Sequence, residues 1–415
     1  LFAVPGEWEA LVPCLGARLP LDRPTEGADE ALDRVPAELV DLARCADRDG
    51  EVPNYLAAVG YQAWTAAIDR DGARELARQE LAVACSNGEA SGVQFARLLD
   101  AIYPEAVHSA PLGATVSAGG AVTLRLWAPT ARTVSVEVLD VVEPEHGTVQ
   151  VRREIPAFRD AATGVWTVHP EAASTLERID IGTAYRWLVH VYAPSTGYAE
   201  YNRVSDPYAH ALTVNATASV VVDLADLTDP TIAPPAWLTT PAPRVPRVVD
   251  HMITELHVRD LSRDAVEIPE AERGTYRAFT RDIPGTRHLR QLAQTGLTTV
   301  HLLPLYDIAT IDEDRTRWPL AAAIEDPARL GSQAPDSASQ QAAVIEARSV
   351  ARRFNWGYDP LHVMAPEGSY AVDAHGAARC GEVREMVGAL HGMGLAVVLD
   401  QVFNHTHACG QDPTS

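Results

Sequence analysis

Three polar residues whose side chains could do chemistry follow an apolar run close to the end of the chain. Asp400, Asn404 and His405 lie in or just after Leu395–Phe403, a segment that predicts a buried strand. A carboxylate that leaves a buried strand needs partners, because burying it alone costs several kcal/mol. A carboxylate, an amide and an imidazole together can hydrogen-bond a polyol. The spacing alone leaves an ordinary strand end, followed by a capped helix, as the alternative.

The elements that must position these groups alternate as strand, helix, strand, helix, strand. The predicted order is strand Val248–Val258, helix Arg287–Gln294, strand Leu297–Leu305, helix Val383–Leu390 and strand Leu395–Phe403. This order is typical of βα repeats with a parallel sheet, in which catalytic groups sit at the carboxyl ends of the strands. Three strands are too few for a closed eight-stranded barrel, which takes about 250 residues. We therefore predict the N-terminal part of an incomplete (β/α)8 barrel over residues 248–415.

The preceding chain divides into three further units. Residues 1–110 read as a mostly helical region, because apolar residues such as Leu56, Val59 and Ala63 recur at helical spacing. Residues 111–228 hold several short alternating runs without a long helix, which is typical of a β-sandwich. Residues 229–247 carry six prolines and predict an extended linker.

Composition narrows the class of protein. The 415 residues are 47% hydrophobic, which is typical of a globular protein of about two to four domains. The formal charge of −22 argues against nucleic acid or an anionic membrane as a partner. No apolar run reaches the length of a membrane span. Five cysteines without metal-site spacing predict free thiols. The chain begins at Leu1 without a visible signal peptide, and between secretion and the cytoplasm we favour secretion.

Several segments resemble one enzyme family. Asp400-x-x-x-Asn404-His405 resembles the first signature region of the α-amylase superfamily, glycoside hydrolase family 13. Phe354–Pro360 (FNWGYDP) followed by Pro366–Tyr370 (PEGSY) resembles type I pullulanase and limit dextrinase, which cut α-1,6 bonds in pullulan, amylopectin and limit dextrins. The start of the sandwich, residues 112–140, resembles a family 48 carbohydrate-binding module. Isoamylase-type debranching is the alternative within the superfamily, because isoamylases share the first signature region.

The resemblance implies a role for each matching residue. Tyr358 corresponds to the aromatic residue that stacks under the sugar at the cleavage subsite, and His405 to the imidazole that hydrogen-bonds the same sugar. Asp400 corresponds to the carboxylate that holds a neighbouring catalytic strand, and Asn404 to a structural calcium ligand of α-amylases. The resemblance implies no required cofactor. The remaining predicted substrate-binding residues shape the loop, for which a purely structural role is the alternative: Asn355, Trp356 and Asp359.

The catalytic carboxylates are not assigned. Retaining glycosidases use two carboxyl groups about 5 Å apart, and the resemblance places them after strands that would follow Ser415. The nearby acids Glu255, Asp260 and Glu367 are not linked by the sequence to a second carboxylate. We therefore expect an intact parent that hydrolyses α-1,6-glucosidic bonds with retention, and a chain that by itself is inactive. A non-catalytic α-glucan-binding protein is the alternative of a different class. Trp127, Trp166 and Trp187 are the strand aromatics of the sandwich that could contact sugar, with core packing as the alternative.

Overall fold

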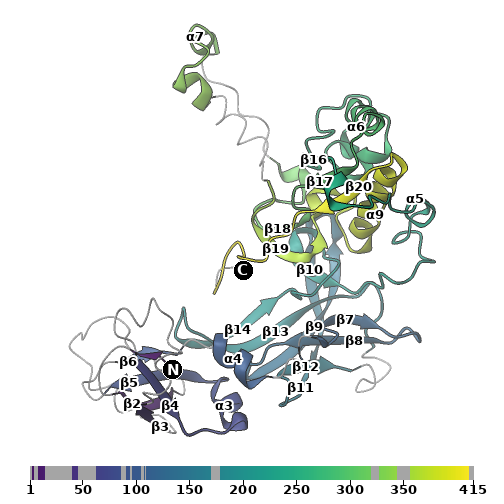
Figure 1. The fold of residues 1–415 in the computed structure, drawn as a ribbon. Helices are drawn as coiled ribbons and strands as arrows, with labels where there is room; N and C mark the ends of the chain where they lie inside the picture. Colours follow the sequence, from purple (N-terminus) through teal and green to yellow (C-terminus); the bar gives the residue numbers. More distant parts are fainter. Residues whose placement is uncertain are drawn as a thin grey trace.

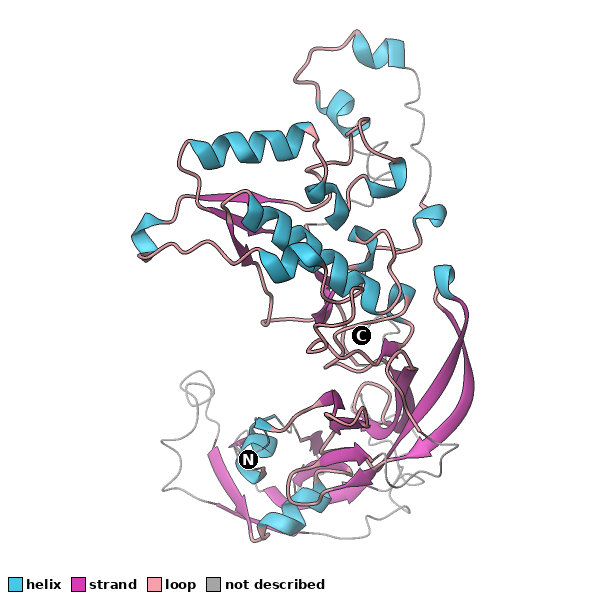
Figure 2. Cartoon of the chain, turned by 90° about the vertical axis from the view of Figure 1, so that its right-hand side faces the viewer, coloured by secondary structure: helices cyan, strands magenta, loops and turns pink. Residues whose placement is uncertain are grey.

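The computed structural model divides into a strand-rich part and a part with a small parallel sheet and most of the helices (Figures 1 and 2). No helix in the described part of the chain is long and apolar enough to cross a membrane. The structure describes residues 2–3, 8–14, 40–44, 62–85, 90–93, 96–103, 107, 109–169, 178–318, 327–343 and 356–410.

The first unit is built on a six-stranded antiparallel sheet with the order β1-β4-β3-β2-β5-β6. Two short helices accompany the sheet, α3 (Arg70–Leu76) and α4 (Ala96–Ile102). Asp69 caps α3 by accepting a hydrogen bond from the Gly72 amide at 2.7 Å. The strands are β1 (Phe2–Ala3), β2 (Trp8–Cys14), β3 (Val40–Arg44), β4 (Gln62–Ala66), β5 (Glu80–Cys85) and β6 (Ala90–Gly92).

The prediction of a mostly helical region over residues 1–110 is therefore wrong for the described residues. Gln62–Ala66 lies within a segment with helical spacing, yet it forms β4 between β1 and β3. Glu80–Cys85 also forms a strand, β5. Short apolar runs are compatible with both the helical and the strand periodicity, so cross-strand partners that are distant in sequence decide between helix and strand. Leu56 and Val59 lie outside the described residues.

Two antiparallel sheets form a β-sandwich, as predicted. One sheet has the order β10-β9-β13-β14 with β15 on β13, and the other has the order β11-β12-β8-β7. Alternating side chains from both sheets, among them Leu124, Val136 and Trp187, fill the core. The strands are β7 (Gly113–Val116), β8 (Val122–Trp127), β9 (Thr133–Glu143), β10 (Thr148–Pro156), β11 (Phe158–Arg159), β12 (Val165–Val168), β13 (Ala184–Ala193), β14 (Tyr198–Val204) and β15 (Ser219–Val220).

The predicted linker contains a helix. Pro235 is the first residue of α5 (Pro235–Thr239), a position where the missing amide hydrogen costs nothing. The Arg384 guanidinium lies 5.4 Å from the ring centre of Trp237 and donates to two carbonyl oxygens of this region, those of Leu224 and Ile232. The segment is therefore held against the helix that carries Arg384 and is not extended throughout.

The last unit contains a three-stranded parallel sheet with the order β16-β17-β20. The three predicted strands are present but shorter, as β16 (Ile253–Leu256), β17 (Thr299–Leu302) and β20 (Ala396–Leu399). The helices α6 (Pro284–Gln294) and α9 (Ala377–Gly392) connect these strands, and α7 (Pro327–Gly331) lies between residues 308 and 360. A separate antiparallel pair joins β18 (Tyr306–Ile308) to β19 (Pro360–Pro366). That these strands begin an eight-stranded barrel stays a prediction.

Candidate functional site

Three residues of the predicted site meet at the carboxyl end of β20. The Tyr358 hydroxyl donates a hydrogen bond to Asp400 Oδ2 at 2.6 Å. The Nε2 atom of His405 lies 3.0 Å from the main-chain oxygen of Tyr358. Tyr358 precedes β19, whereas the other two follow β20, so tertiary structure brings together groups more than 40 positions apart.

Local backbone features place these groups. The Asp400 amide donates to the Leu302 carbonyl at 3.1 Å, which extends the pairing of β20 with β17 as far as Asp400. Gly357 has a φ of 96°, and a Cβ at this position would lie 2.9 Å from the Pro304 carbonyl oxygen. Only glycine lets residues 356–359 pass this closely over the end of β17.

The site is open to solvent. Tyr358 is 37% exposed and Phe403, just beyond Asp400, is 78% exposed. The hydrogen bond to Asp400, followed by partial burial, raises the pKa of Tyr358 to about 12. The phenol therefore stays protonated and keeps donating to the carboxylate. An accessible ring face beside a carboxylate and an imidazole can stack on an apolar face of a pyranose and hydrogen-bond its hydroxyls.

The other predicted residues support this loop or lie elsewhere. Asp359 accepts a hydrogen bond from the Thr310 hydroxyl at 2.8 Å, and its carbonyl accepts one from the Ala309 amide at 3.0 Å. It therefore fixes the loop to the chain after β18. Trp356 is exposed at the start of this loop, and Asn355 lies outside the described residues.

Asn404 orients the imidazole. Its Oδ1 lies 3.1 Å from His405 Nδ1, and His405 Nε2 lies 3.0 Å from the Tyr358 carbonyl. Both partners are acceptors, so an imidazole with a single N–H donates to one of them and is held beside the other. Both residues are exposed. The closely spaced carboxyl groups among the described residues are those of Asp307, Glu313 and Glu367. The predicted role of Asn404 as a calcium ligand stays a prediction.

Tyr306 is a neighbour of the site that the sequence did not single out. It is 1% exposed, and its hydroxyl has no hydrogen-bond partner among the described residues. Burial, followed by the negative charge of Asp400, raises the pKa of Tyr306. The sequence did not indicate a role for Tyr306, because a tyrosine directly after the predicted apolar strand Leu297–Leu305 is typical of a core residue.

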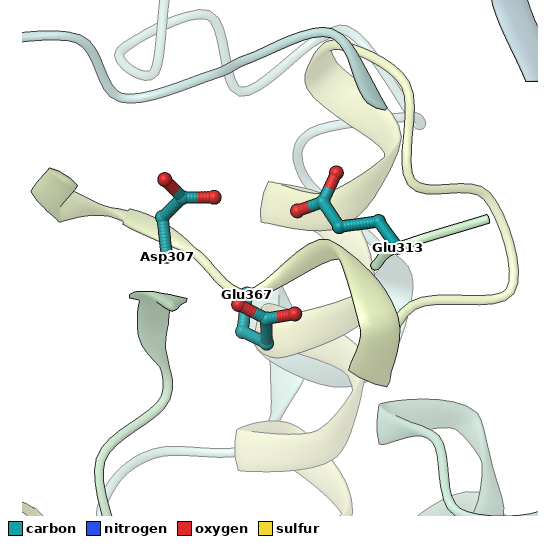
Figure 3. A group of neighbouring side chains, drawn as sticks. All are labelled: Asp307, Glu313 and Glu367. Atoms are coloured by element: carbon teal, nitrogen blue, oxygen red, sulfur yellow. The ribbon is translucent and has the colours of Figure 1, made fainter. Parts of the chain in front are cut away.

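The sequence also did not predict a cluster of three acids. Asp307, Glu313 and Glu367 place carboxyl oxygens within 4.8 Å of one another (Figure 3). The sequence had left Glu367 without a carboxylate neighbour. The spacing suits the pair of a retaining glycosidase, but all three side chains are buried and a sugar cannot reach them.

The donor set of this cluster fits a guanidinium rather than a metal ion. Arg379, fully buried in the first turn of α9, donates to Glu313 Oε1 at 3.0 Å and to Oε2 at 2.9 Å. Both oxygens of Glu367 accept main-chain amides, those of Ser369 and Ile308. Because these oxygens are already occupied by hydrogen bonds, they offer a cation few free lone pairs.

The tryptophans of the sandwich are not equally accessible. Trp187 and Trp166 are buried in the core and cannot contact a sugar, whereas Trp127 is half-buried and donates to the Thr163 carbonyl. The outer face of β13 and β14 carries a different aromatic pair. His190 stacks on the exposed Tyr201 with ring centres 4.2 Å apart and an interplanar angle of 6°.

Comparison with known proteins supports these observations. Residues 111–209 match the family described as Carbohydrate-binding module 48 (Isoamylase N-terminal domain). A chloroplastic pullulanase of Arabidopsis thaliana is 36% identical over 345 residues, which are 81% of this chain and 33% of the relative. The pullulanase of Klebsiella pneumoniae is 36% identical over 77% of this chain and 31% of its own. The chain thus spans about a third of the length of these curated relatives. An isoamylase from Flavobacterium sp is 30% identical over 38% of this chain and 16% of its own length.

Solved structures give the same result. PulA from Klebsiella oxytoca matches with a TM-score of 0.80 and 29% identity, covering 98% of this chain and 40% of that one. A maltotriose complex of PulA from Klebsiella pneumoniae matches with a TM-score of 0.76 and 27% identity, covering 98% of this chain and 45% of that one. The pullulanase matches in sequence extend over most of the chain and those in structure over almost all of it, so the chain is similar to part of a type I pullulanase of the α-amylase superfamily and contains a carbohydrate-binding module of family 48.

Proposed function

We propose that this chain supplies the α-glucan-binding part of a starch-debranching glycoside hydrolase that cleaves α-1,6-glucosidic bonds with retention. The observation that carries the proposal is the exposed Tyr358 ring, held by its hydroxyl to Asp400 and by its carbonyl to His405. The pullulanase relatives, and a maltotriose complex of one of them, support α-glucans as the ligand, with pullulan, amylopectin and limit dextrins as substrates.

The proposed roles follow from the chemistry of each group. The Tyr358 ring stacks beneath the sugar, where its π face stabilises positive charge that develops on an oxocarbenium-like ring. His405 hydrogen-bonds a hydroxyl of the same sugar with one ring nitrogen, in place of its contact with Asn404 or with the Tyr358 carbonyl. Asp400 holds the Tyr358 ring and is placed to pair with a cation on a neighbouring strand. Trp356 and Asp359 shape the rim of the subsite, and Asn355 is assigned the same role.

We place the catalytic pair outside residues 1–415. Among the described residues, the acids that gather at the spacing of a retaining pair are buried against Arg379. The proposed units are residues 1–110, the sandwich 111–228, the connecting segment 229–247, and the first barrel strands within 248–415. On this proposal the 415-residue chain binds glucan without hydrolysing it.

The sandwich is proposed to add a glucan contact of its own. The exposed face of Tyr201, backed by His190, is flat enough to stack on a pyranose. Arg203, on the same strand, pairs with Glu137 at 2.9 Å and offers further donors beside the ring. The match to a carbohydrate-binding module supports a glucan contact on this unit, and the burial of Trp166 and Trp187 argues against them as that contact.

The experiment that tests the proposal is affinity electrophoresis of the 415-residue chain in gels containing pullulan, amylopectin or dextran. We expect retardation by the two α-glucans with α-1,4 links and none by dextran. Tyr358→Ala should reduce the apparent affinity for pullulan about tenfold, since a stacked ring contributes up to about 1.5 kcal/mol. The matched control is Tyr198→Ala, which removes a more exposed tyrosine of the sandwich.

Two further assays separate the alternatives. A reducing-sugar assay on pullulan should stay at the blank value, and release of maltotriose would contradict the placement of the catalytic pair. Retardation by glycogen but not by pullulan would favour the isoamylase type. Unchanged retardation in Tyr358→Ala, with loss in Tyr201→Ala, would favour a non-catalytic glucan-binding protein that uses the sandwich alone.

A further inference from the structure

The buried acid cluster lies where the sandwich meets the antiparallel pair β18–β19. Asn215, in the 3-10 helix Val214–Ala216 of the sandwich, donates its amide to Glu313 Oε2 at 2.6 Å. Its side-chain oxygen accepts the Glu313 amide at 2.7 Å. Arg379 adds a bond to the Thr213 carbonyl at 3.3 Å. One guanidinium and one carboxylate therefore hold main-chain groups of both units.

The charges of this cluster do not balance when every acid is ionised. Three carboxylates of Asp307, Glu313 and Glu367 face one guanidinium, and all four side chains are buried. His362 is the other group that can carry positive charge, because its Nδ1 lies 2.9 Å from Asp307 Oδ2. Three negative charges this close cannot all persist at a buried site. The cluster must retain a proton that the same residues lose in the unfolded chain.

Glu367 is the best place for this proton. Glu313 has the direct bidentate contact with Arg379, and Asp307 has His362, whereas Glu367 accepts only main-chain amides. Burial, followed by the charges of Glu313 and Asp307, holds the pKa of Glu367 well above its ordinary value of 4.5. Burial also raises the pKa of Glu313, to about 7. Because the acids interact strongly, the proton belongs to the cluster as a whole.

We propose that Asp307, Glu313, Glu367 and Arg379 form a proton-retaining joint, and that loss of its proton at rising pH loosens the sandwich from β18–β19. The other titratable groups around Glu367 come from four elements. They are Tyr276 in Tyr276–Thr280, His362 on β19, Tyr370 in Gly368–Tyr370, and Glu382 on α9. Both tyrosines stay neutral at ordinary pH because burial raises the pKa of each.

The sign of the effect follows from proton linkage. A carboxyl group whose pKa is higher in the folded state stabilises the fold fully below the unfolded pKa, near 4.5. That stabilisation is lost as the pH rises through the folded value, which for Glu313 is about 7. The folded state should therefore weaken from about pH 5 to about pH 8.

Asp307→Asn is the variant that removes one negative charge with the least disturbance. The new amide can donate to His362 Nδ1, while His362 Nε2 donates to the Ser205 hydroxyl, which lies 2.8 Å away. Two carboxylates remain against Arg379, so the cluster carries one negative charge fewer and binds its proton less tightly. The variant should therefore have a flatter dependence of stability on pH.

The experiment measures denaturant unfolding of the full chain across this pH interval. We expect the folding equilibrium constant of the wild type to fall by about 100-fold, and that of Asp307→Asn by less than about tenfold. The control is Asp140→Asn, which removes an exposed carboxylate of the sandwich and should retain the slope of the wild type. Equal slopes for all three proteins would overturn the proposal.

Hydrogen exchange of the wild type decides the question even if the variant fails to fold. Four amides donate directly to the cluster, and their protection, corrected for intrinsic exchange, should fall about tenfold or more as the pH rises. The Trp187 amide in the sandwich core should keep its protection. A uniform change over all of these amides, or none, would overturn the proposal. The reporting amides are those of Asn215, Ile308, Gly368 and Ser369.

Discussion

The open site at the end of β20 and the buried joint between the sandwich and β18–β19 use the same kinds of side chain for opposite purposes. At the open site, Asp400 takes one hydrogen bond from Tyr358, and the ring stays accessible. In the joint, both oxygens of Glu313 are bound by Arg379 and by main-chain amides, and the side chain is buried. Burial therefore separates a carboxylate that can meet a ligand from one that holds the fold. Changes in the joint should reduce stability, whereas changes at the open site should reduce binding.

The largest expected effect is in the joint. Arg379→Met should reduce the free energy of unfolding by about 3–5 kcal/mol, because it leaves buried carboxylates without their cation. Denaturant unfolding measures the loss. Arg203→Met, which removes the exposed partner of another buried glutamate, should cost less than about 1 kcal/mol. Equal losses in the two variants would remove the distinction between buried and open ion pairs.

A smaller effect is expected for the glycine that shapes the open site. Gly357→Ala forces a φ of 96° on a residue with a Cβ, which would lie 2.9 Å from the Pro304 carbonyl. We expect a cost of about 1–3 kcal/mol in stability and weaker glucan retardation. Gly392→Ala, at a position with open space around the added carbon, is the control. Normal binding by Gly357→Ala would show that residues 356–359 tolerate another path.

Tyr358→Phe separates the ring from its hydroxyl. The variant keeps the stacking face but loses the hydrogen bond to Asp400. We expect a loss of about 0.5–1 kcal/mol in glucan affinity, which is about two- to fivefold and smaller than the loss for Tyr358→Ala, with little change in unfolding. Calorimetric titration with maltohexaose measures the affinity. A loss as large as that of Tyr358→Ala would assign the binding to the hydroxyl rather than to the ring.

The smallest expected effect is on the sandwich. Tyr201→Ala should weaken retardation by pullulan by only a few-fold, because the ring is backed by one neighbour and is not enclosed. Phe158→Ala, on the opposite sheet and similarly exposed, should leave it unchanged. If both variants behave like the wild type, the glucan contact rests on the open site alone.

The sequence predicted the open site better than the first unit. The resemblance assigned Tyr358 and His405 to the same sugar and Asp400 to a neighbouring strand, and in the structure Tyr358 contacts both. The first unit was predicted as helical, yet its described residues form mainly a sheet. Short segments such as Gln62–Ala66 lack a decisive periodicity, so the prediction failed where pairing partners distant in sequence determine the conformation.

By itself, the sequence determined the alternating strands of the sandwich, the order of the parallel strands and the residue types at their ends. These follow from local patterns of apolar and polar residues, which act over a few positions. Tertiary structure alone decided which carboxylates are buried and which tryptophans are accessible. Glu313 and Arg379 are 66 positions apart, and only folding brings the carboxylate and the guanidinium to 2.9 Å at a buried position. Burial and charge pairing depend on neighbours in space, and no local pattern in the sequence records them.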